Sequence, residues 1–285
     1  MSRLFNETRK AQEWSSQHGK TKKLELAQVM EAAQEPLGHP KTSRASSLSA
    51  CRATRLSESS ESPVLFAKNE FTNAAAEAYR TLRTRLLRLQ QDTGLRSVVI
   101  SSAVPGEGKS ITTLNLGICC AHLPDVRVLV IDADLRTAGL TALLGSLPAP
   151  GLGEILTGEE PYDRAIMATD TPNLYVLGVG SSTASPPALF SGDRWKELLG
   201  WCSENFSLTL VDSPPIIPLA DFEQIAASCD AVLAVVRSRH ADREVVRKAA
   251  QTIDARKLIG VVLNASILDD GEYSYDYYGS NGKKT

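Results

Sequence analysis

The sequence predicts an α/β protein built on a doubly wound, mainly parallel sheet. From Ser97 onward, short apolar runs alternate with segments of helical periodicity, an order that is typical of such folds. Most of the runs are continuous stretches of Val, Ile and Leu, as expected of strands that helices cover on both faces. With 285 residues, 42% of them hydrophobic, the chain is long enough to bury such a core.

The predicted elements follow one another in a regular order. The expected strands are Ser97–Ser102, Arg127–Ile131, Leu174–Leu177, Leu208–Val211, Ala231–Val236 and Leu258–Leu263. The expected helices between them are Ser110–His122, Arg194–Cys202, Asp221–Ala227 and Asp242–Ile253. A further helix should precede the first strand, capped by Asn73 and running to about Leu89, because apolar residues recur there at helical spacing.

The first 62 residues differ in composition from the rest. They are rich in serine and poor in large apolar side chains, so we expect a mostly disordered arm, with order beginning near Val64. Residues 1–60 contain ten Lys and Arg but only six Glu, and the whole chain carries −2, so the arm is basic and the remainder acidic. A mixed-charge tail is a commoner explanation of such an arm than a contact with anionic lipid or nucleic acid, and no nucleic-acid partner is expected. The predicted organisation is an arm at 1–62, a folded domain at 63–268 and a flexible tail at 269–285.

Cysteine usage and hydropathy suggest a cytoplasmic protein. The five cysteines are an odd number without metal-ligand spacing, so we expect reduced thiols. No apolar run approaches the roughly 20 residues of a membrane span. The first residues lack the apolar centre of a signal peptide, and we therefore expect a soluble chain.

The most informative motif lies between the strand Ser97–Ser102 and the helix that follows it. It reads Ala103-Val104-Pro105-Gly106-Glu107-Gly108-Lys109-Ser110, and Ala103 stands where the usual pattern has its first glycine. Glycines allow backbone N–H groups to close around phosphate oxygens, and the helix N-terminus adds its positive end. Lys109 can reach the terminal phosphates of a nucleotide, and the Ser110 hydroxyl can hold Mg²⁺. The motif predicts a P-loop NTPase fold, with nucleotide contacts from Pro105, Gly106, Glu107, Gly108, Lys109, Ser110 and Ile111.

Carboxylates follow two further strands. Asp132 and Asp134 lie two residues apart at the end of one strand, and Asp212 closes another. Because the carboxyl ends of parallel strands share one edge of the sheet, these groups should lie beside the phosphate loop. One carboxylate can help to hold Mg²⁺ and one can accept a proton from an attacking hydroxyl. Arg136 can pair with one of them or with phosphate.

Two features near the C-terminus complete the candidate site. Asn264 follows the last strand, where its amide can face an adenine edge or serve as a turn residue. Beyond it, four tyrosines lie within six residues of a glycine-containing tail, and they are Tyr273, Tyr275, Tyr277 and Tyr278. A hydroxyl-rich tail beside a Mg²⁺–ATP site is a ready phosphate acceptor, although it can also be a tail that docks on a partner.

Taken together, these motifs resemble the bacterial tyrosine kinases of capsule and exopolysaccharide synthesis, over roughly Phe71 to Tyr278. The matching segments are Pro105–Ser110, the Asp-x-Asp-x-Arg of residues 132–136, the Asp-x-Pro-Pro of residues 212–215, Gly151–Gly158 and the tyrosine tail. The family's Glu-x-x-Arg-x-x-Arg pattern matches Glu77, Arg80 and Arg83, which implies ring-like self-association through that helix. After Arg136 the sequence departs from the family, since Thr137-Ala138-Gly139 replace a basic residue and a proline.

The resemblance implies an ATP-dependent kinase that phosphorylates its own tyrosine tail in a neighbouring subunit. Lys109, Asp132, Asp134 and Asp212 would be catalytic, and Ser110, Asp132 and Asp212 would hold Mg²⁺. Asp134 is the expected proton acceptor, although Asp132 and Asp134 can exchange roles. Since no span is evident, the resemblance implies a cytoplasmic protein that a membrane-anchored polysaccharide co-polymerase activates at the inner face of the membrane.

Two other functions compete with this hypothesis. A partitioning ATPase of the same P-loop class would carry a second lysine early in the loop, where this chain has Val104. Such a protein would also leave the tyrosine tail unexplained. A non-catalytic nucleotide-binding scaffold of the polysaccharide machinery is the third reading.

Overall fold

The computed structural model describes residues 48, 51–56, 74–145, 147–182, 184–217 and 221–265. The expected cap Asn73, most of the N-terminal arm and the tyrosine tail lie outside these ranges. The chain divides into the units Met1–Ala45 and Ser46–Thr285, and every described residue belongs to the second.

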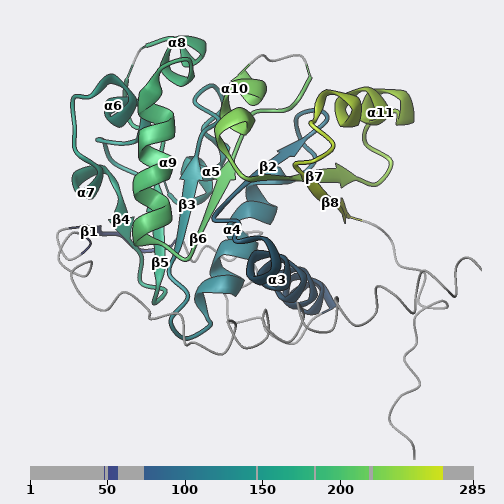
Figure 1. The fold of residues 1–285 in the computed structure, drawn as a ribbon, viewed down its shortest axis with the longest axis horizontal. Coiled ribbons are helices and arrows are strands. Elements are labelled where there is room, and N and C mark those ends of the chain that lie inside the picture. The colour runs from purple at the N-terminus through teal and green to yellow at the C-terminus, as the bar shows by residue number, and fades with distance from the viewer. Residues whose placement is uncertain are drawn as a thin grey trace, which may run out of the picture. The chain divides into compact units, whose positions relative to one another are not determined.

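Within the described ranges, eight strands form one sheet in the order β1-β4-β5-β3-β6-β2-β7-β8 (Figure 1). Their bounds are β1 Arg52–Ala53, β2 Ser97–Ser102, β3 Val128–Asp132, β4 Met167–Ala168, β5 Leu174–Leu177, β6 Leu208–Asp212, β7 Ala231–Arg237 and β8 Leu258–Asn264. All neighbours are parallel except β4 and β5, which are antiparallel. The doubly wound, mainly parallel α/β fold is therefore confirmed.

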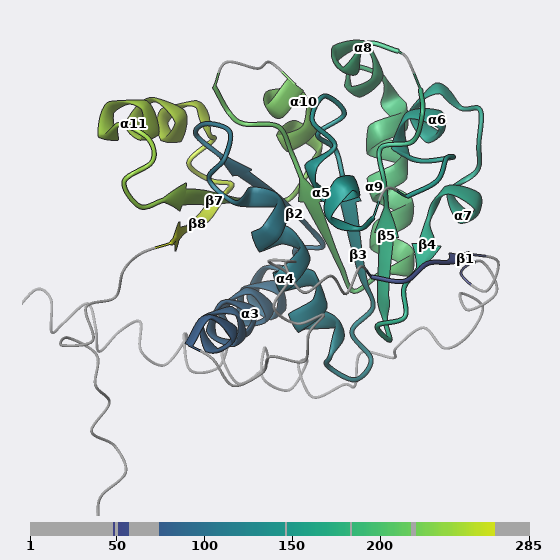
Figure 2. The ribbon, with the colours of Figure 1, turned by 180° about the vertical axis from the view of Figure 1, so that it is seen from behind.

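Helices cover both faces of this sheet (Figures 1 and 2). One face packs on α3, α4 and α5, and the other on α6, α8, α9, α10 and α11. The helix bounds are α3 Ala74–Thr93, α4 Lys109–Ala121, α5 Gly139–Leu143, α6 Leu152–Thr157, α7 Tyr162–Ala165, α8 Pro186–Phe190, α9 Asp193–Asn205, α10 Asp221–Ser228 and α11 Arg243–Thr252.

Alternation of side chains along the strands builds two cores. In β2, Val99 joins the core beneath α9 and α10, whereas Val98 and Ile100 join the core beneath α3 and α4. Both sets are buried because successive residues of a strand point to opposite faces. This burial explains why the strands read as continuous apolar runs in the sequence.

The ordered fold begins earlier than the sequence predicts. Order was expected near Val64, but Arg52–Ala53 pair with β4 as a parallel edge strand. Leu48 and Leu56, on either side of that strand, are both buried in the two cores. A strand of two residues is too short to leave a pattern in a serine-rich segment. All five cysteines lie in the described residues, and each is a free thiol there.

Candidate nucleotide-binding active site

The phosphate loop leaves the carboxyl end of β2, a strand that lies between β6 and β7. Residues 103–108 form the loop and Lys109 begins α4, so the sequence places strand, loop and helix in the expected order. The N-terminus of a thirteen-residue helix thus faces the edge of the sheet where the carboxylates gather. Backbone N–H groups and the positive end of the helix favour an anion there.

Lys109 is the cation at the centre of this site. Its Nζ donates to Asp134 Oδ2 at 2.9 Å and lies 3.7 Å from Asp212 Oδ1. Burial opposes the charge, but Asp212 and Asp134 outweigh it and hold the pKa of Lys109 above its ordinary value. The ammonium is therefore charged at neutral pH.

Asp132 and Asp212 lie side by side because of the sheet register, which pairs them across β3 and β6. Both are fully buried. Burial raises the pKa of Asp212 to about 7, although Lys109 acts in the opposite direction. Burial likewise raises the pKa of Asp132 to about 6, against hydrogen bonds from Thr141. Two carboxylates held this close in a dry environment favour a bound cation.

Thr141 orients Asp132, and sequence reasoning missed it. Its backbone N and its Oγ1 both donate to Asp132 Oδ2 at 2.7 Å. The backbone N of Asp134 donates to the other oxygen at 3.2 Å. Thr141 lies in α5, a five-residue helix that is too short to show helical periodicity in the sequence.

Arg136 does not contact the carboxylates that precede it. Its Nε donates to Asp221 Oδ2 at 2.7 Å, and Asp221 is buried at the start of α10. This pairing corrects the expectation that Arg136 pairs with one of the strand-end aspartates, whereas a contact of Arg136 with phosphate stays a prediction. The buried carboxylate of Asp221 thus forms an ion pair with Arg136, while Lys109 forms ion pairs with Asp134 and Asp212.

The residues present fit a magnesium ion. Both side-chain oxygens of Asp212 are buried without a hydrogen-bond partner, and the Lys109 ammonium is 3.7 Å from one of them, so a further cation would offset the cost of burial. Ser110, one residue after Lys109, supplies a hydroxyl beside the same carboxylate. No cluster of three His, Cys, Asp or Glu side chains in the described residues is arranged to hold a metal by itself. Mg²⁺ does not need one, because it usually keeps waters and substrate phosphates as ligands.

The remaining predicted residues lie in two places. Asn264 is beside the phosphate loop, where its Nδ2 donates to Glu107 O at 2.8 Å. On α3, Arg80 pairs with Glu77 at 2.6 Å, and Arg83 donates to Cys119 O of α4 at 2.9 Å. Arg83 therefore also fastens α3 to α4, which the sequence did not predict. Tyr273, Tyr275, Tyr277 and Tyr278 lie outside the described residues.

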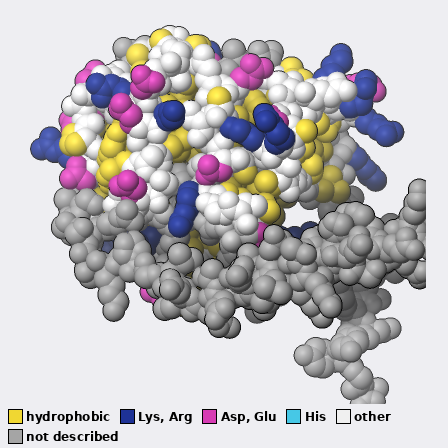
Figure 3. Space-filling view, in the orientation of Figure 1, with side chains coloured by type: hydrophobic (Ala, Val, Ile, Leu, Met, Phe, Trp, Pro, Cys, Tyr) yellow, Lys and Arg dark blue, Asp and Glu magenta, His cyan; other side chains and the backbone are white. Residues whose placement is uncertain are grey.

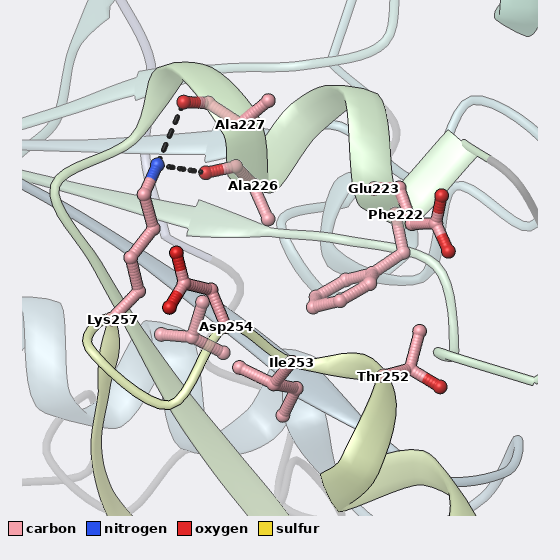
Figure 4. Close-up of a pocket in the computed structure, with 9 residues that line it drawn as sticks. Phe222, Glu223, Ala226, Ala227, Thr252, Ile253, Asp254 and Lys257 are labelled. Atoms are coloured by element: carbon pink, nitrogen blue, oxygen red, sulfur yellow. Dashed lines mark hydrogen bonds between the residues drawn. The ribbon is translucent and has the colours of Figure 1, made fainter.

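A separate pocket of about 540 Å³ lies between α10 and the connection from α11 to β8 (Figure 4). It is found where β7 and β8 begin, at the edge of the sheet opposite the phosphate loop. Lys257 in this pocket donates to the carbonyls of Ala226, Ala227 and Cys229, at 2.7–2.9 Å. Its ammonium thus caps the C-terminal end of α10. Among the described residues, no helix is both long and apolar enough to cross a membrane.

Comparison with known proteins gives relatives that are named as tyrosine-protein kinases. No family model matches the chain. It is 31% identical to the tyrosine-protein kinase YwqD of Bacillus subtilis over 218 residues, which cover 76% of this chain and 91% of YwqD. It is 33% identical over 224 residues to the putative tyrosine-protein kinase EpsB of Ralstonia solanacearum, covering 77% of this chain but only 29% of EpsB.

Solved structures extend the comparison. The kinase domain of the Escherichia coli tyrosine kinase ETK superposes with a TM-score of 0.66 at 26% identity, covering 80% of this chain and 94% of that domain. The cell division ATPase MinD of Pyrococcus furiosus gives 0.51 at 26% identity, covering 59% of this chain and 71% of MinD. The chain thus spans nearly all of YwqD and of the ETK domain and shares a more distant P-loop fold with MinD. It belongs to the family of bacterial tyrosine-protein kinases.

Proposed function

We propose that this protein transfers the γ-phosphoryl group of Mg²⁺–ATP to tyrosine hydroxyls, including those of its own C-terminal tail in a neighbouring subunit. The observation that carries the proposal is the convergence of Lys109, Asp134 and Asp212 on the phosphate loop. The tail itself lies outside the described residues, so its role rests on the sequence and on family membership.

The residues divide the chemistry among themselves. N–H groups of residues 106–110 and the Lys109 ammonium would bind the phosphates, and Ser110, Asp132 and Asp212 would hold the metal. Bound Mg²⁺ neutralises phosphate charge during the transfer. A bond forms between the tyrosine oxygen and the γ-phosphorus while the bond to the bridging oxygen breaks, so ADP leaves and the phenolic proton passes to a carboxylate.

Asp134 is the better proton acceptor of the two neighbouring carboxylates. Thr141 already fills one oxygen of Asp132 with two short hydrogen bonds. Asp134 instead accepts from Lys109 on Oδ2 and, at 3.2 Å, from the backbone N of Thr137 on Oδ1, and phosphate can draw the ammonium away. The released oxygen of Asp134 then faces the transferred group. If Asp132 can accept the proton in place of Asp134, an Asp134→Asn variant should keep residual kinase activity.

Assembly and activation are further parts of the proposal. Glu77, Arg80 and Arg83 would contribute to a ring of subunits through α3, and phosphates added to the tail would loosen that ring by charge repulsion. A membrane-anchored polysaccharide co-polymerase would activate the kinase at the inner face of the membrane.

Mass-spectrometric mapping of phosphate on the purified full chain tests the proposal. With Mg²⁺–ATP we expect phosphotyrosine at residues 273–278 in the wild type and at least a hundredfold less in Lys109→Met, by the scale of transition-state electrostatic contributions, roughly 10²–10³ per group. Asp254→Asn is the matched control, because Asp254 is exposed and lies at the edge of the sheet opposite the phosphate loop.

Two results with the purified protein would contradict the proposal. One is the absence of phosphotyrosine in the tail even when the cytoplasmic segment of an activating partner is added. The other is steady ATP hydrolysis without phosphotyrosine, which would favour the partitioning-type ATPase that the MinD likeness suggests. Unchanged polysaccharide output in an Asp134→Asn strain would instead favour a non-catalytic scaffold.

A further inference from the structure

Three consecutive carbonyl groups of the phosphate loop, those of residues 105–107, accept hydrogen bonds from side chains outside the loop. The first accepts from His240 Nε2 at 2.9 Å and the second from Arg237 Nη1 at 3.2 Å. The third accepts from Asn264 Nδ2 at 2.8 Å. A carbonyl oxygen only accepts, so the His240 ring carries its hydrogen on Nε2. These three donors come from β7, the turn after it and the end of β8, and Figure 2 shows that turn beside the β2–α4 loop.

The direction of these bonds decides where the loop's N–H groups point. In a planar trans peptide, the N–H of one residue points opposite to the C=O of the residue before it. Carbonyls 105–107 are drawn toward His240, Arg237 and Asn264. The N–H groups of residues 106–108 must therefore face the other way, away from these three side chains and toward the site where phosphate binds.

The fit of the loop glycines supports the same arrangement. Gly106 and Gly108 have φ values of +83° and +93°, which side chains other than glycine rarely adopt. A Cβ at position 106 would lie 3.2 Å from His240 Nε2, and one at position 108 would collide with Asn264 Nδ2. The side chains of His240 and Asn264 thus pack directly against the loop backbone.

These donors are themselves held in place. Arg237 and Asn264 are partners in the β7–β8 register, and Ser238 N donates to Asn264 O at 2.9 Å. His240 N donates to Arg237 O at 3.3 Å. The buried Glu107 carboxylate accepts a hydrogen bond from the backbone N of Arg237 at 3.4 Å, which is a second link between the loop and β7. The donors therefore form one connected unit with the edge of the sheet.

We propose that His240, Arg237 and Asn264 are positioning residues, a loop brace that orients the phosphate loop before the nucleotide arrives. The proposal rests on nucleotide binding at this loop. It assigns Asn264 to the loop backbone rather than to the adenine base. Its Oδ1 accepts from Ala265 N at 2.9 Å, so both ends of the amide are engaged with backbone.

Inorganic triphosphate separates phosphate positioning from base recognition, because it has no adenine. We would measure the Kd of Mg²⁺–ATP and of Mg²⁺–triphosphate for the full chain and for His240→Ala, Arg237→Ala and Asn264→Ala. Each single variant should bind both ligands about three- to tenfold more weakly, the effect of one hydrogen bond. His240→Gln keeps a donor and should recover most of the affinity.

The controls separate positioning from stability and from charge. Thermal midpoints without nucleotide should change little for His240→Ala and Arg237→Ala, since both side chains are exposed. Arg239→Gln removes a neighbouring charge without removing a loop bond and should leave both affinities near the wild-type value. Weaker ATP binding with unchanged triphosphate binding in Asn264→Ala would assign that residue to adenine and overturn its place in the brace. Wild-type affinity in His240→Ala would overturn the brace as a whole, whereas a wild type that binds neither ligand would refute the proposed function itself.

Discussion

Asp212 is the residue in which stability and function oppose each other most directly. Its carboxylate is fully buried, and burial raises its pKa to about 7 from 3.8. The folded state therefore binds a proton more tightly than the unfolded chain does. Ionisation of Asp212 removes stability as pH rises from about 4, and the loss is complete above about 7.

Asp212→Asn should therefore make the protein more stable while abolishing kinase activity. Since Asn cannot ionise, we expect the metal- and nucleotide-free variant to exceed the wild type by about 1–4 kcal/mol at pH 8, with a smaller gain at pH 5. Urea unfolding in the presence of a chelator at both pH values measures this difference.

Asp254→Asn is the control for that comparison. Hydrogen bonds from Arg256 lower the pKa of Asp254 to about 2, so its removal should give no gain at pH 8. A less stable Asp212→Asn variant at pH 8 would mean that attraction between Lys109 and Asp212 outweighs the burial of the carboxylate.

At the scale of elements, α10 depends on a cap that comes from a distant part of the chain. Lys257 donates to three carbonyls at the C-terminal end of this helix, where a positive charge also interacts favourably with the negative end of the helix dipole. We expect Lys257→Ala to lower the free energy of unfolding by about 1–3 kcal/mol, because it leaves these carbonyls without their charged donor.

Urea titration monitored by circular dichroism measures this loss. Lys248→Ala removes an exposed lysine from α11 and should change the free energy by less than about 0.5 kcal/mol. Equal effects of the two substitutions would show that the cap contributes nothing beyond an ordinary surface lysine.

The predictability of the elements follows from their length and burial. The longer strands were predicted to within one residue at each end, because burial on both faces makes them continuous apolar runs. Asp132, Asp134 and Asp212 were placed correctly since they close such runs. By contrast, α5, α6 and α8 have five or six residues each, too few for a helical period to emerge. The contacts of Thr141, Arg136 and Lys257 depend on how these elements pack, which no local pattern encodes.

Over the molecule as a whole, charge is unevenly distributed. Figure 3 shows one face of the molecule, on which basic side chains gather at the end formed by α11. That helix follows the turn after β7, and Arg237 at the end of β7 and His240 in the turn both contact the phosphate loop. Basic side chains near this edge of the sheet would favour the approach of an anionic nucleotide.

Concentration dependence tests the proposed transfer between subunits. Because the acceptor tyrosine belongs to a neighbour, the initial rate of phosphorylation per subunit should fall when the protein is diluted below its association range. Phosphotyrosine formation measured over a hundredfold dilution gives this dependence. A rate per subunit that does not change with dilution would show that each subunit modifies its own tail.

The anchoring of Asn264 on Glu107 gives this test its physical meaning. Tyr273 lies nine residues after Asn264, and nine residues span at most about 30 Å when fully extended. Asn264 contacts the same loop that holds Lys109, and Lys109 contacts Asp134. The residue from which the tail begins is thus held beside the proposed donor site, within about 30 Å of Tyr273 along the chain. Chain length alone therefore does not exclude self-modification, and the dilution experiment decides between transfer within a subunit and transfer to a neighbour.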